Sequence, residues 1–237
     1  MTVSTKAASI IAMDGPAASG KSTIGALLAE KLDYLYFDTG VMYRVVTCLA
    51  LSRSIPITDE AAITELAENA QIEFLPPDVN DGRQFTIRAD GRDITWEIRT
   101  REVDANVSPV STYAGVRRAM TAQQRRIGLK GRVVMVGRDI GTVVLPEADL
   151  KIYLDATEAE RANRRYLERR ERGEPVEYAA VLREIQRRDQ IDSSRSVAPL
   201  KQADDAVYVD STGLDVPEVL ARIEEILNAI PRPEIEL

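Results

Sequence analysis

Short runs of apolar residues alternate with longer amphipathic stretches along most of the chain. The runs occupy residues 10–13, 34–37, 133–136, 150–154 and 206–209. Their length and composition are typical of buried strands, and the stretches between them repeat apolar positions at helical spacing. Strands that alternate with helices in this way favour a parallel sheet. The pattern predicts an α/β fold whose core is a doubly wound, five-stranded parallel sheet.

One segment departs from this alternation. Polar and apolar positions alternate over residues 72–75 and 85–88, and the turn sequence Asn80-Asp81-Gly82 lies between them. This pattern predicts a small antiparallel sheet, which helical stretches at 59–69 and 101–107 would accompany. The predicted division is a core of residues 1–55, 108–155 and 196–230, an insert of 56–107, an arginine-rich lid with its following helix at 156–195, and a tail at 231–237.

The most specific motif lies between the first predicted strand and the first predicted helix. It is the phosphate-loop sequence Gly15-Pro16-Ala17-Ala18-Ser19-Gly20-Lys21-Ser22, followed by Thr23. Glycines allow backbone N–H groups to turn toward a polyphosphate, and the helix N-terminus attracts negative charge. We expect Lys21 to neutralise the β- and γ-phosphates and the Ser22 hydroxyl to be a ligand of Mg²⁺. The chain is therefore predicted to bind a nucleoside triphosphate with Mg²⁺.

Composition narrows the chemistry and the partners. The net charge of −7 and an aromatic content of 5% argue against a nucleic-acid partner. The chain has no His, which excludes His-based acid–base and metal chemistry but suits a kinase whose acceptor is an already anionic phosphate. A single Cys, and the lack of a signal sequence or membrane-length apolar stretch, predict a cytoplasmic protein with no membrane partner. We expect a monomer.

Polar residues directly follow two other predicted strands, and in such sheets ligands bind beyond the carboxyl ends of the strands. Asp38-Thr39-Gly40, with Tyr43 and Arg44, follows the second strand. Arg44 suits an acceptor phosphate, and the alternative is a solvated surface arginine. Gly137-Arg138-Asp139 follows the third strand. Arg138 could reach phosphate while Asp139 accepts hydrogen bonds. The alternatives are a structural Arg138–Asp139 ion pair, or an Asp139 that holds Mg²⁺ through water.

Arginines are dense after the fourth strand. Arg161, Arg165 and Arg169 are spaced four apart, which predicts a like-charged stripe on one helix face. Glu160–Arg164 and Glu168–Arg172 are instead ordinary i,i+4 pairs. Gly173-Glu174-Pro175 predicts a hinge, after which Arg188, Asp192 and Arg195 would share one face if the helix extends that far. A mobile lid that excludes water and stabilises the transferring charge is one interpretation. A salt-bridged surface hairpin is the other.

Together these residues resemble the bacterial cytidylate (CMP/dCMP) kinases over nearly the whole chain, from Ile10 to about Thr212. The matching stretches begin at Asp14-Gly15-Pro16, Asp38-Thr39-Gly40, Glu97-Ile98-Arg99, Gly137-Arg138-Asp139, Lys151-Ile152-Tyr153, Ser196-Val197-Ala198 and Asp210-Ser211-Thr212. The phosphate loop is shared by many families. The Gly137-Arg138-Asp139 and Val197-Ala198-Pro199-Leu200 stretches, with the insert, are more specific.

The resemblance implies a nucleoside-monophosphate kinase with ATP and CMP or dCMP as substrates. Residues Gly15 to Thr23 would bind ATP, with the lid residues Arg161 and Arg165. Lys21, Arg138 and Arg188 would be catalytic. Asp38, Thr39, Tyr43, Arg44, Arg138 and Arg188 would bind the acceptor near its phosphate. Ser108, Arg117 and Asp139 would contact the cytosine, and Asp192 and Arg195 the sugar. Pro109 follows Ser108 directly and could alter its backbone, and Arg118 is an alternative to Arg117.

Two other functions fit part of the sequence. The Thr39-Gly40 and Arg44 pattern alone permits an adenylate or uridylate kinase, but the insert and the Gly137-Arg138-Asp139 stretch argue against it. A regulatory NTPase, such as a GTPase, would need an Asn-Lys-x-Asp guanine motif, which the sequence does not contain.

Overall fold

The computed structural model describes residues 8–75, 77–83 and 85–229. It divides into two compact units, one of Met1–Asp38 with Arg125–Leu237 and one of Thr39–Gln124. The predicted tail at 231–237 and Pro76 lie outside the described residues. The second unit includes residues 39–55 and 108–124 along with the predicted insert, and in it helix α2 (Gly40–Ser52) packs against α3 (Glu60–Asn69) and α4 (Arg101–Val110). The predicted domain division stays a prediction.

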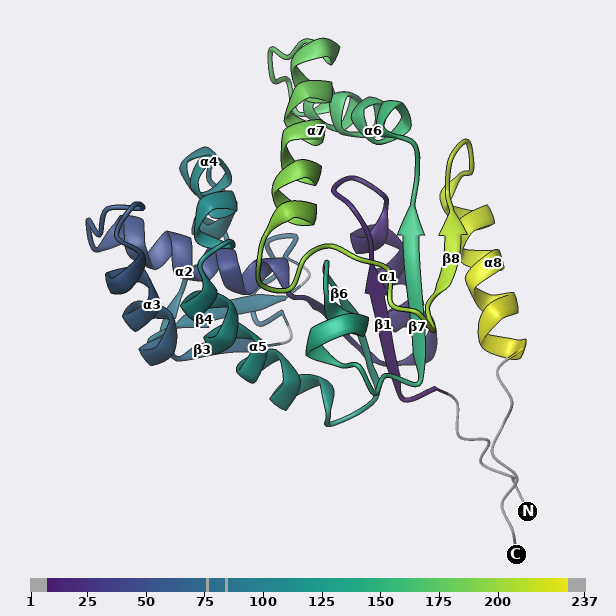
Figure 1. Ribbon diagram of the computed structural model, residues 1–237, viewed down its shortest axis with the longest axis horizontal. Coiled ribbons are helices and arrows are strands. Elements are labelled where there is room, and N and C mark those ends of the chain that lie inside the picture. Colours follow the sequence, from purple (N-terminus) through teal and green to yellow (C-terminus); the bar gives the residue numbers. More distant parts are fainter. Residues whose placement is uncertain (1–7, 76, 84, 230–237) are drawn as a thin grey trace, which may run out of the picture. The chain divides into compact units, whose positions relative to one another are not determined.

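The first unit contains the five-stranded sheet that the apolar runs predict. Its strands are β1 (Ile10–Asp14), β2 (Leu35–Asp38), β6 (Val133–Val136), β7 (Leu150–Asp155) and β8 (Val207–Asp210). The order is β2-β6-β1-β7-β8 and every neighbouring pair is parallel. In this register Met13 pairs with Val136 and Asp14 with Tyr153. The carboxyl ends of β1, β6 and β7 therefore meet at one edge of the sheet (Figure 1).

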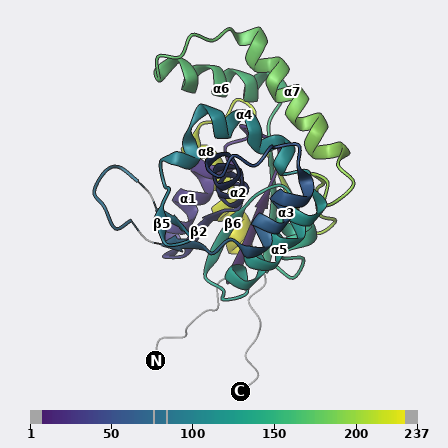
Figure 2. The same cartoon turned by 90° about the vertical axis from the view of Figure 1, so that its left-hand side faces the viewer.

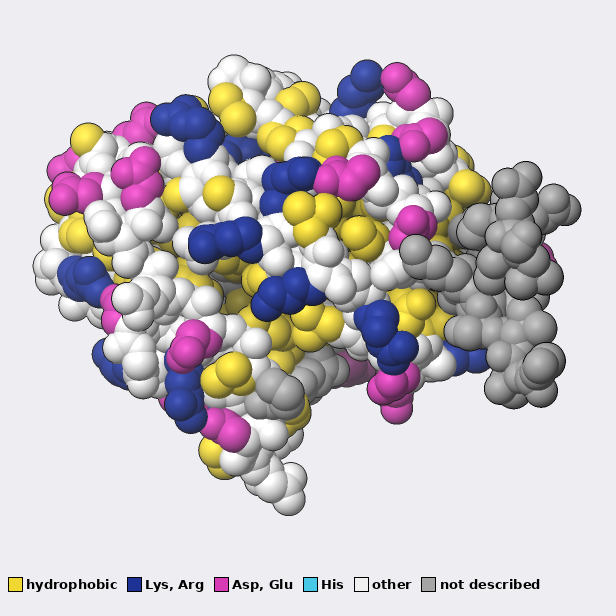
Figure 3. Space-filling model, turned by 90° about the horizontal axis from the view of Figure 1, so that it is seen from below, with side chains coloured by type: hydrophobic (Ala, Val, Ile, Leu, Met, Phe, Trp, Pro, Cys, Tyr) yellow, Lys and Arg dark blue, Asp and Glu magenta, His cyan; other side chains and the backbone are white. Residues whose placement is uncertain are grey.

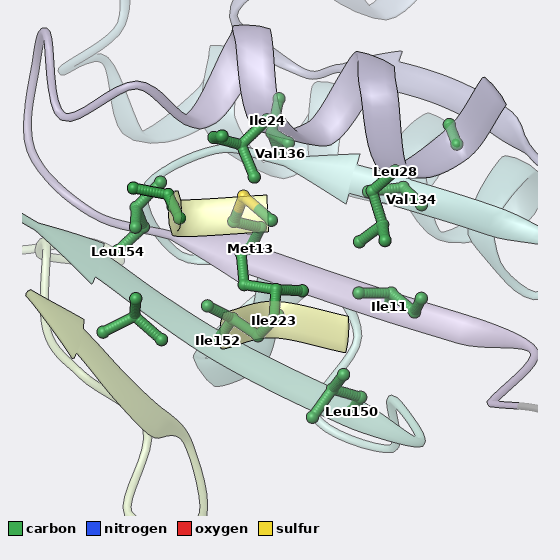
Figure 4. Packing of buried hydrophobic residues seen from close by; sticks show 13 residues of the cluster. Ile11, Met13, Ile24, Leu28, Val134, Val136, Leu150, Ile152, Leu154 and Ile223 are labelled. Carbon is green, nitrogen blue, oxygen red and sulfur yellow. The ribbon is translucent and has the colours of Figure 1, made fainter. Parts of the chain in front are cut away.

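Helices α1 (Lys21–Leu32) and α8 (Val216–Ala229) cover one face of this sheet. Ile11 and Met13 of β1 point to that face and pack with Leu28 of α1 and Ile223 of α8, all four fully buried (Figure 4). Burial of such side chains contributes about 1.5–3 kcal/mol each to folding. The core thus holds the strand that precedes the phosphate loop against the helix that follows it.

The remaining elements of the first unit follow β6 and β7. A π-helical segment, η2 (Ile140–Val144), follows β6. After β7 come α6 (Glu158–Glu171) and α7 (Tyr178–Ser194), which pack against each other. In Figure 1 α6 runs across the upright α7, and in both views a loop joins the two helices (Figures 1 and 2). Gly173 has φ of +74° in the connection between them, so the predicted break is confirmed.

The second unit contains the predicted antiparallel sheet. Its strands are β3 (Ile72–Leu75), β4 (Thr86–Ala89) and β5 (Arg92–Asp93), paired in that order. The predicted helical stretches become α3 and α4, which Asp59 and Thr100 cap by accepting a backbone N–H three residues on. A short 3-10 helix, η1 (Glu97–Arg99), precedes α4. Helix α5 (Ala114–Gly128) begins in this unit and ends in the first.

None of the described helices is long and apolar enough to cross a membrane. On the described part of the face in Figure 3, basic and acidic side chains are both present and neither forms a continuous surface. This mixed pattern accords with the acidic net charge of the sequence.

Candidate active site

The phosphate-loop sequence connects β1 to α1, as its context predicts. Gly15 has φ of +146°, and a Cβ atom there would lie 2.0 Å from the Leu154 carbonyl oxygen, so only glycine fits. Lys21 is 5% exposed, and its Nζ donates to the Pro16 carbonyl at 2.5 Å and to Ser19 Oγ at 3.0 Å. The ammonium group is thus held inside the loop at the start of α1. This arrangement suits a bound polyphosphate.

The surroundings of Lys21 favour an anionic ligand. Its pKa lies well below the usual value, chiefly because the side chain is buried and also because Arg138 and Arg188 repel a further positive charge. Asp38 and Asp14 act in the opposite direction. A polyphosphate at the loop would offset the repulsion of Lys21 by the two arginines and so favour its charged form.

Two carboxylates end strands of the sheet beside the loop. Asp38, which the sequence places near the acceptor, accepts a hydrogen bond from Ser22 Oγ at 3.1 Å. From the sequence, Asp14 is only the first residue of the matching Asp14-Gly15-Pro16 stretch, with no role assigned to it. It is buried and accepts hydrogen bonds from the backbone N–H groups of Ile140 and Gly141, both at 2.7 Å, and burial raises its pKa to about 6. A carboxylate at the end of an apolar strand, directly before the loop, was the available signal.

Arg138 and Asp139 follow β6, and each faces the end of α7 or the residue after it. Arg138 Nε lies 3.0 Å from Asp192 Oδ2. Asp139 is 5% exposed, and its Oδ1 lies 3.5 Å from Arg195 Nη2. The sequence allowed an ion pair between Arg138 and Asp139. In the structure Arg138 pairs with Asp192, 54 residues further along the chain, and Asp139 pairs with Arg195.

Helix α7 carries Arg188 and Asp192 one turn apart, as predicted. The helix ends at Ser194, so Arg195 is its C-cap rather than part of the same helical face. Arg195 nevertheless approaches Asp192, with Nη1 3.4 Å from Oδ1. Burial alone would raise the pKa of Asp192, but Arg138, Arg188 and Arg195 lower it below its usual value. The structure thus brings together five predicted site residues: Arg138, Asp139, Arg188, Asp192 and Arg195. Lys21 is close enough for Arg138 and Arg188 to lower its pKa.

Arg161, Arg165 and Arg169 lie on α6 as predicted, and Arg165 and Arg169 are paired as the salt-bridged alternative predicted. Arg165 and Arg169 pair with Glu168 and Glu174 at 2.9 Å, so the face is salt-bridged. Arg161 is buried rather than solvated. Its Nη1 lies 2.6 Å from Asp189 Oδ2 of α7 and 3.2 Å from the Ala17 carbonyl of the phosphate loop. The spacing correctly placed these residues on one helix, and Glu168 belongs to that helix too, but Glu174, Asp189 and the Ala17 carbonyl lie outside it.

Arg164 is a contact that sequence reasoning missed. Its predicted i,i+4 pair with Glu160 is present at 2.9 Å, and so is the contact between Glu168 and Arg172. Arg164 also donates to the Ser211 carbonyl at 2.6 Å, beyond β8, and Ser211 Oγ donates to the Ser19 carbonyl at 3.3 Å. Two arginines of α6 therefore support the phosphate loop: Arg161 at the Ala17 carbonyl, and Arg164 through Ser211.

Replacing Arg161 with Ala should destabilise the fold far more than replacing Arg165. The Arg161 and Asp189 side chains are 5% and 17% exposed, so the change leaves a largely buried carboxylate unpaired, which costs about 3–5 kcal/mol. The Arg165 and Glu168 side chains are 36% and 43% exposed, and loss of that pair costs about 0–1 kcal/mol. Urea unfolding of both variants measures the difference. Equal losses would show that the Arg161–Asp189 pair is not a buried support.

In the second unit, Arg44 is held by its own neighbours. Its Nη1 donates to the Ile98 carbonyl at 3.0 Å and its Nη2 lies 2.5 Å from Asp104 Oδ1. Thr39 and Tyr43, at the start of the same helix α2, are buried. Ser108 lies in α4, which continues to Val110 despite Pro109, so the proline does not break the helix at Ser108.

Arg117 and Arg118 differ in their surroundings within this unit. Arg117 is 2% exposed, lies over the ring of Tyr43 at 5.3 Å and donates to the Ser111 carbonyl at 3.1 Å. Arg118, the next residue of α5, is exposed. Arg117 is therefore the arginine that shares its environment with Tyr43 of the predicted acceptor set.

Comparisons with known proteins agree with the sequence motifs. The family model described as "Cytidylate kinase" matches residues 11–231. A cytidylate kinase of Bacillus velezensis is 48% identical over 218 residues, which cover 92% of this chain and 96% of that protein. A cytidylate kinase of Chloroflexus aggregans is 50% identical over 213 residues, covering 90% and 91%. An uncharacterized protein from Eubacterium ventriosum is similar in fold, with a TM-score of 0.51 at 11% identity, covering 93% of this chain and 98% of that one.

Proposed function

The chain belongs to the cytidylate kinase family and is an ATP-dependent kinase of CMP and dCMP, and we propose that the residues gathered around the phosphate loop carry the transfer. Lys21, Arg138 and Arg188 stabilise the negative charge that spreads over the transferring phosphoryl group. The observation that most supports this is that Lys21 Nζ is held inside the loop at the Pro16 carbonyl and Ser19 Oγ, while Arg138 pairs with Asp192 of the helix that carries Arg188. The acceptor phosphate attacks as an anion, so the chain needs no His as a general base.

On the donor side, residues Gly15 to Thr23 hold the phosphates of ATP through backbone N–H groups. Among the described residues, no group of three or more Asp, Glu, Cys or His side chains could hold a metal ion by itself. A Mg²⁺ that arrives with ATP needs only one or two protein oxygens, with phosphates and water completing its shell. The Ser22 hydroxyl, with Asp38 Oδ2 3.1 Å away, fits that requirement. Mg²⁺ would neutralise charge on the phosphates, and the lid residues Arg161 and Arg165 complete the proposed donor set.

On the acceptor side, the proposal assigns phosphate contacts to Arg44, Arg138 and Arg188, and it includes Asp38, Thr39 and Tyr43 among the acceptor-binding residues. Ser108, Arg117 and Asp139 contact the cytosine, and Asp192 and Arg195 the sugar. Asp139 is buried and its position is fixed by the ion pair with Arg195. Both features support its proposed role as the acceptor of a hydrogen bond from the exocyclic amine of cytosine. Nothing in the relatives favours AMP or UMP as the acceptor, or a regulatory NTPase. The cytoplasmic location and the monomeric state stay predictions.

A coupled assay of ADP formation tests the donor assignment. With ATP and Mg²⁺, both CMP and dCMP should be turned over, and excess chelator should reduce the rate to background because the phosphate charge is then not neutralised. Adding Mg²⁺ back should restore the rate. Undiminished turnover in chelator would contradict the proposed role of Mg²⁺ at Ser22 and Asp38.

A further inference from the structure

Asp14 connects two segments of the site without belonging to either set of predicted contacts. It is the last residue of β1, and Gly15 of the phosphate loop follows it directly. Its two carboxylate oxygens each accept one backbone N–H, from Ile140 and Gly141, at 2.7 Å. Those N–H groups belong to the first two residues of η2, directly after Arg138 and Asp139. Both bonds span more than 120 residues of sequence, with separations of 126 and 127.

We propose that Asp14 is a positioning residue, which sets the Arg138-Asp139 segment against the phosphate loop so that acceptor and donor phosphates meet in line. This inference rests on the proposed roles of Arg138 and Asp139. The carboxylate does not touch substrate. Its effect is indirect. Asp14 ends β1, the strand that leads into the phosphate loop, and its two oxygens accept the N–H groups of Ile140 and Gly141, which follow Arg138 and Asp139.

The packing around Gly141 leaves this segment little freedom to shift. A Cβ atom at Gly141 would lie 3.4 Å from Asp14 Oδ2 and 3.1 Å from Lys151 Cδ. Lys151 is itself buried on β7, and its Nζ is held by both oxygens of Asp205 at 2.7 and 2.9 Å. The η2 backbone therefore rests on two side chains from neighbouring strands, and Asp14 is the one that also hydrogen-bonds to it.

The energetics point to a role in function rather than in stability. Burial raises the pKa of Asp14 to about 6, although the two backbone hydrogen bonds partly oppose that shift. A carboxyl whose pKa is higher in the folded chain than in the unfolded chain makes the fold less stable as it ionises. Stability should therefore fall as the pH rises from about 4 through about 6, and at neutral pH the fold is less stable than it would be with Asp14 protonated. A buried charge with that effect, directly between the phosphate loop and Arg138, is consistent with a positioning role.

The test compares Asp14→Asn with Asp149→Asn. Asp149 is a matched control because its Oδ2 also accepts two backbone N–H groups of the same strand region, from Ser9 and Ile10 at 2.8 Å, but at the end of β1 remote from the loop. In Asp14→Asn an amide NH₂ must face one of the two η2 N–H groups, which displaces the segment. We expect kcat for CMP to fall about 10- to 100-fold, because a shift of the reacting groups by up to about 1 Å lowers the rate by that much. The Kd for ATP should change much less than kcat, because the backbone N–H groups of the loop stay in place and only the weaker effect of Asp14 on Lys21 is lost.

Several outcomes would overturn the inference. One is an Asp14→Asn enzyme whose kcat per folded molecule equals that of Asp149→Asn, whatever its melting temperature. Another is a loss of ATP affinity as large as the loss of kcat, which would place the effect in the phosphate loop itself. If Asp14→Asn does not fold, Gly141→Ala displaces the same segment while keeping the carboxylate, and turnover equal to that of the unmodified chain would then sink the proposal.

Two further measurements separate this inference from the proposed function. The unmodified chain must phosphorylate CMP, and Arg138→Ala must lose that turnover. If both hold while Asp14→Asn retains full kcat, only the positioning role fails. If Arg138→Ala retains turnover, the proposed acceptor role fails, and the positioning role that rests on it fails too.

Discussion

Lys21→Ala should lower kcat by about 100- to 1000-fold, the range found when a group that stabilises transition-state charge is removed. Its Nζ lies inside the phosphate loop, and the charge that it contributes matters most when the phosphoryl group is in transfer. The melting temperature should hardly change. Burial and the two nearby arginines already disfavour the charged form of Lys21, so the charge itself does not stabilise the fold.

Lys31→Ala is the matched control for this variant. Lys31 lies in the last turn of the same helix, with a 56% exposed side chain that pairs with Glu224. Loss of an exposed pair costs about 0–1 kcal/mol and should not alter kcat. A Lys21→Ala enzyme that melts normally and matches the kcat of Lys31→Ala would disprove the role of the phosphate loop.

Asp139→Asn should sharply lower the preference for CMP over UMP. A carboxylate accepts a hydrogen bond from the exocyclic amine of cytosine but repels the carbonyl oxygen that uracil presents there. A mismatched buried polar partner costs about 1–3 kcal/mol, which corresponds to roughly a ten- to hundredfold discrimination. An Asn amide can donate to the uracil carbonyl, so the ratio of kcat/KM for CMP and UMP should fall by about that factor.

Asp192→Asn provides the contrast for that measurement. Asp192 is also buried beside Arg195, but its proposed contact is the sugar, which CMP and UMP share. Its loss should lower kcat/KM for both nucleotides and keep their ratio. If Asp139→Asn does the same, Asp139 does not contact the base, and the alternative role near Mg²⁺ becomes the better account.

The sheet could be predicted from the sequence because its strands are short apolar runs separated by amphipathic stretches, although only β1, β6 and β7 are largely buried and the edge strands β2 and β8 are not. All five runs became strands, and the alternating insert became the small antiparallel sheet. The conformation of η2 could not be predicted, because it depends on Asp14 reaching N–H groups 126 and 127 residues away. Local periodicity contains no information on such contacts.

Among the site residues too, features set by local sequence could be predicted, and features that depend on distant contacts could not. The strand-to-helix context of the phosphate loop is local, and it folds as expected. The surroundings of Arg161 were misjudged, because helical spacing identifies a face of α6 but not the Asp189 and Ala17 groups that cover it. Arg117 differs from Arg118 for a similar reason, since the ring of Tyr43 determines which arginine turns inward.

Internal competition between acceptors tests the central claim most directly. CMP, UMP, AMP and GMP at equal concentrations are incubated with Mg²⁺ and limiting ATP, and the consumption of each monophosphate is measured. Relative consumption reports the ratio of kcat/KM values for the competing acceptors. CMP should be consumed first, with AMP and GMP almost unchanged and UMP slower by roughly ten- to hundredfold. Consumption of AMP at the same rate as CMP would contradict the assignment of this site to cytidine nucleotides.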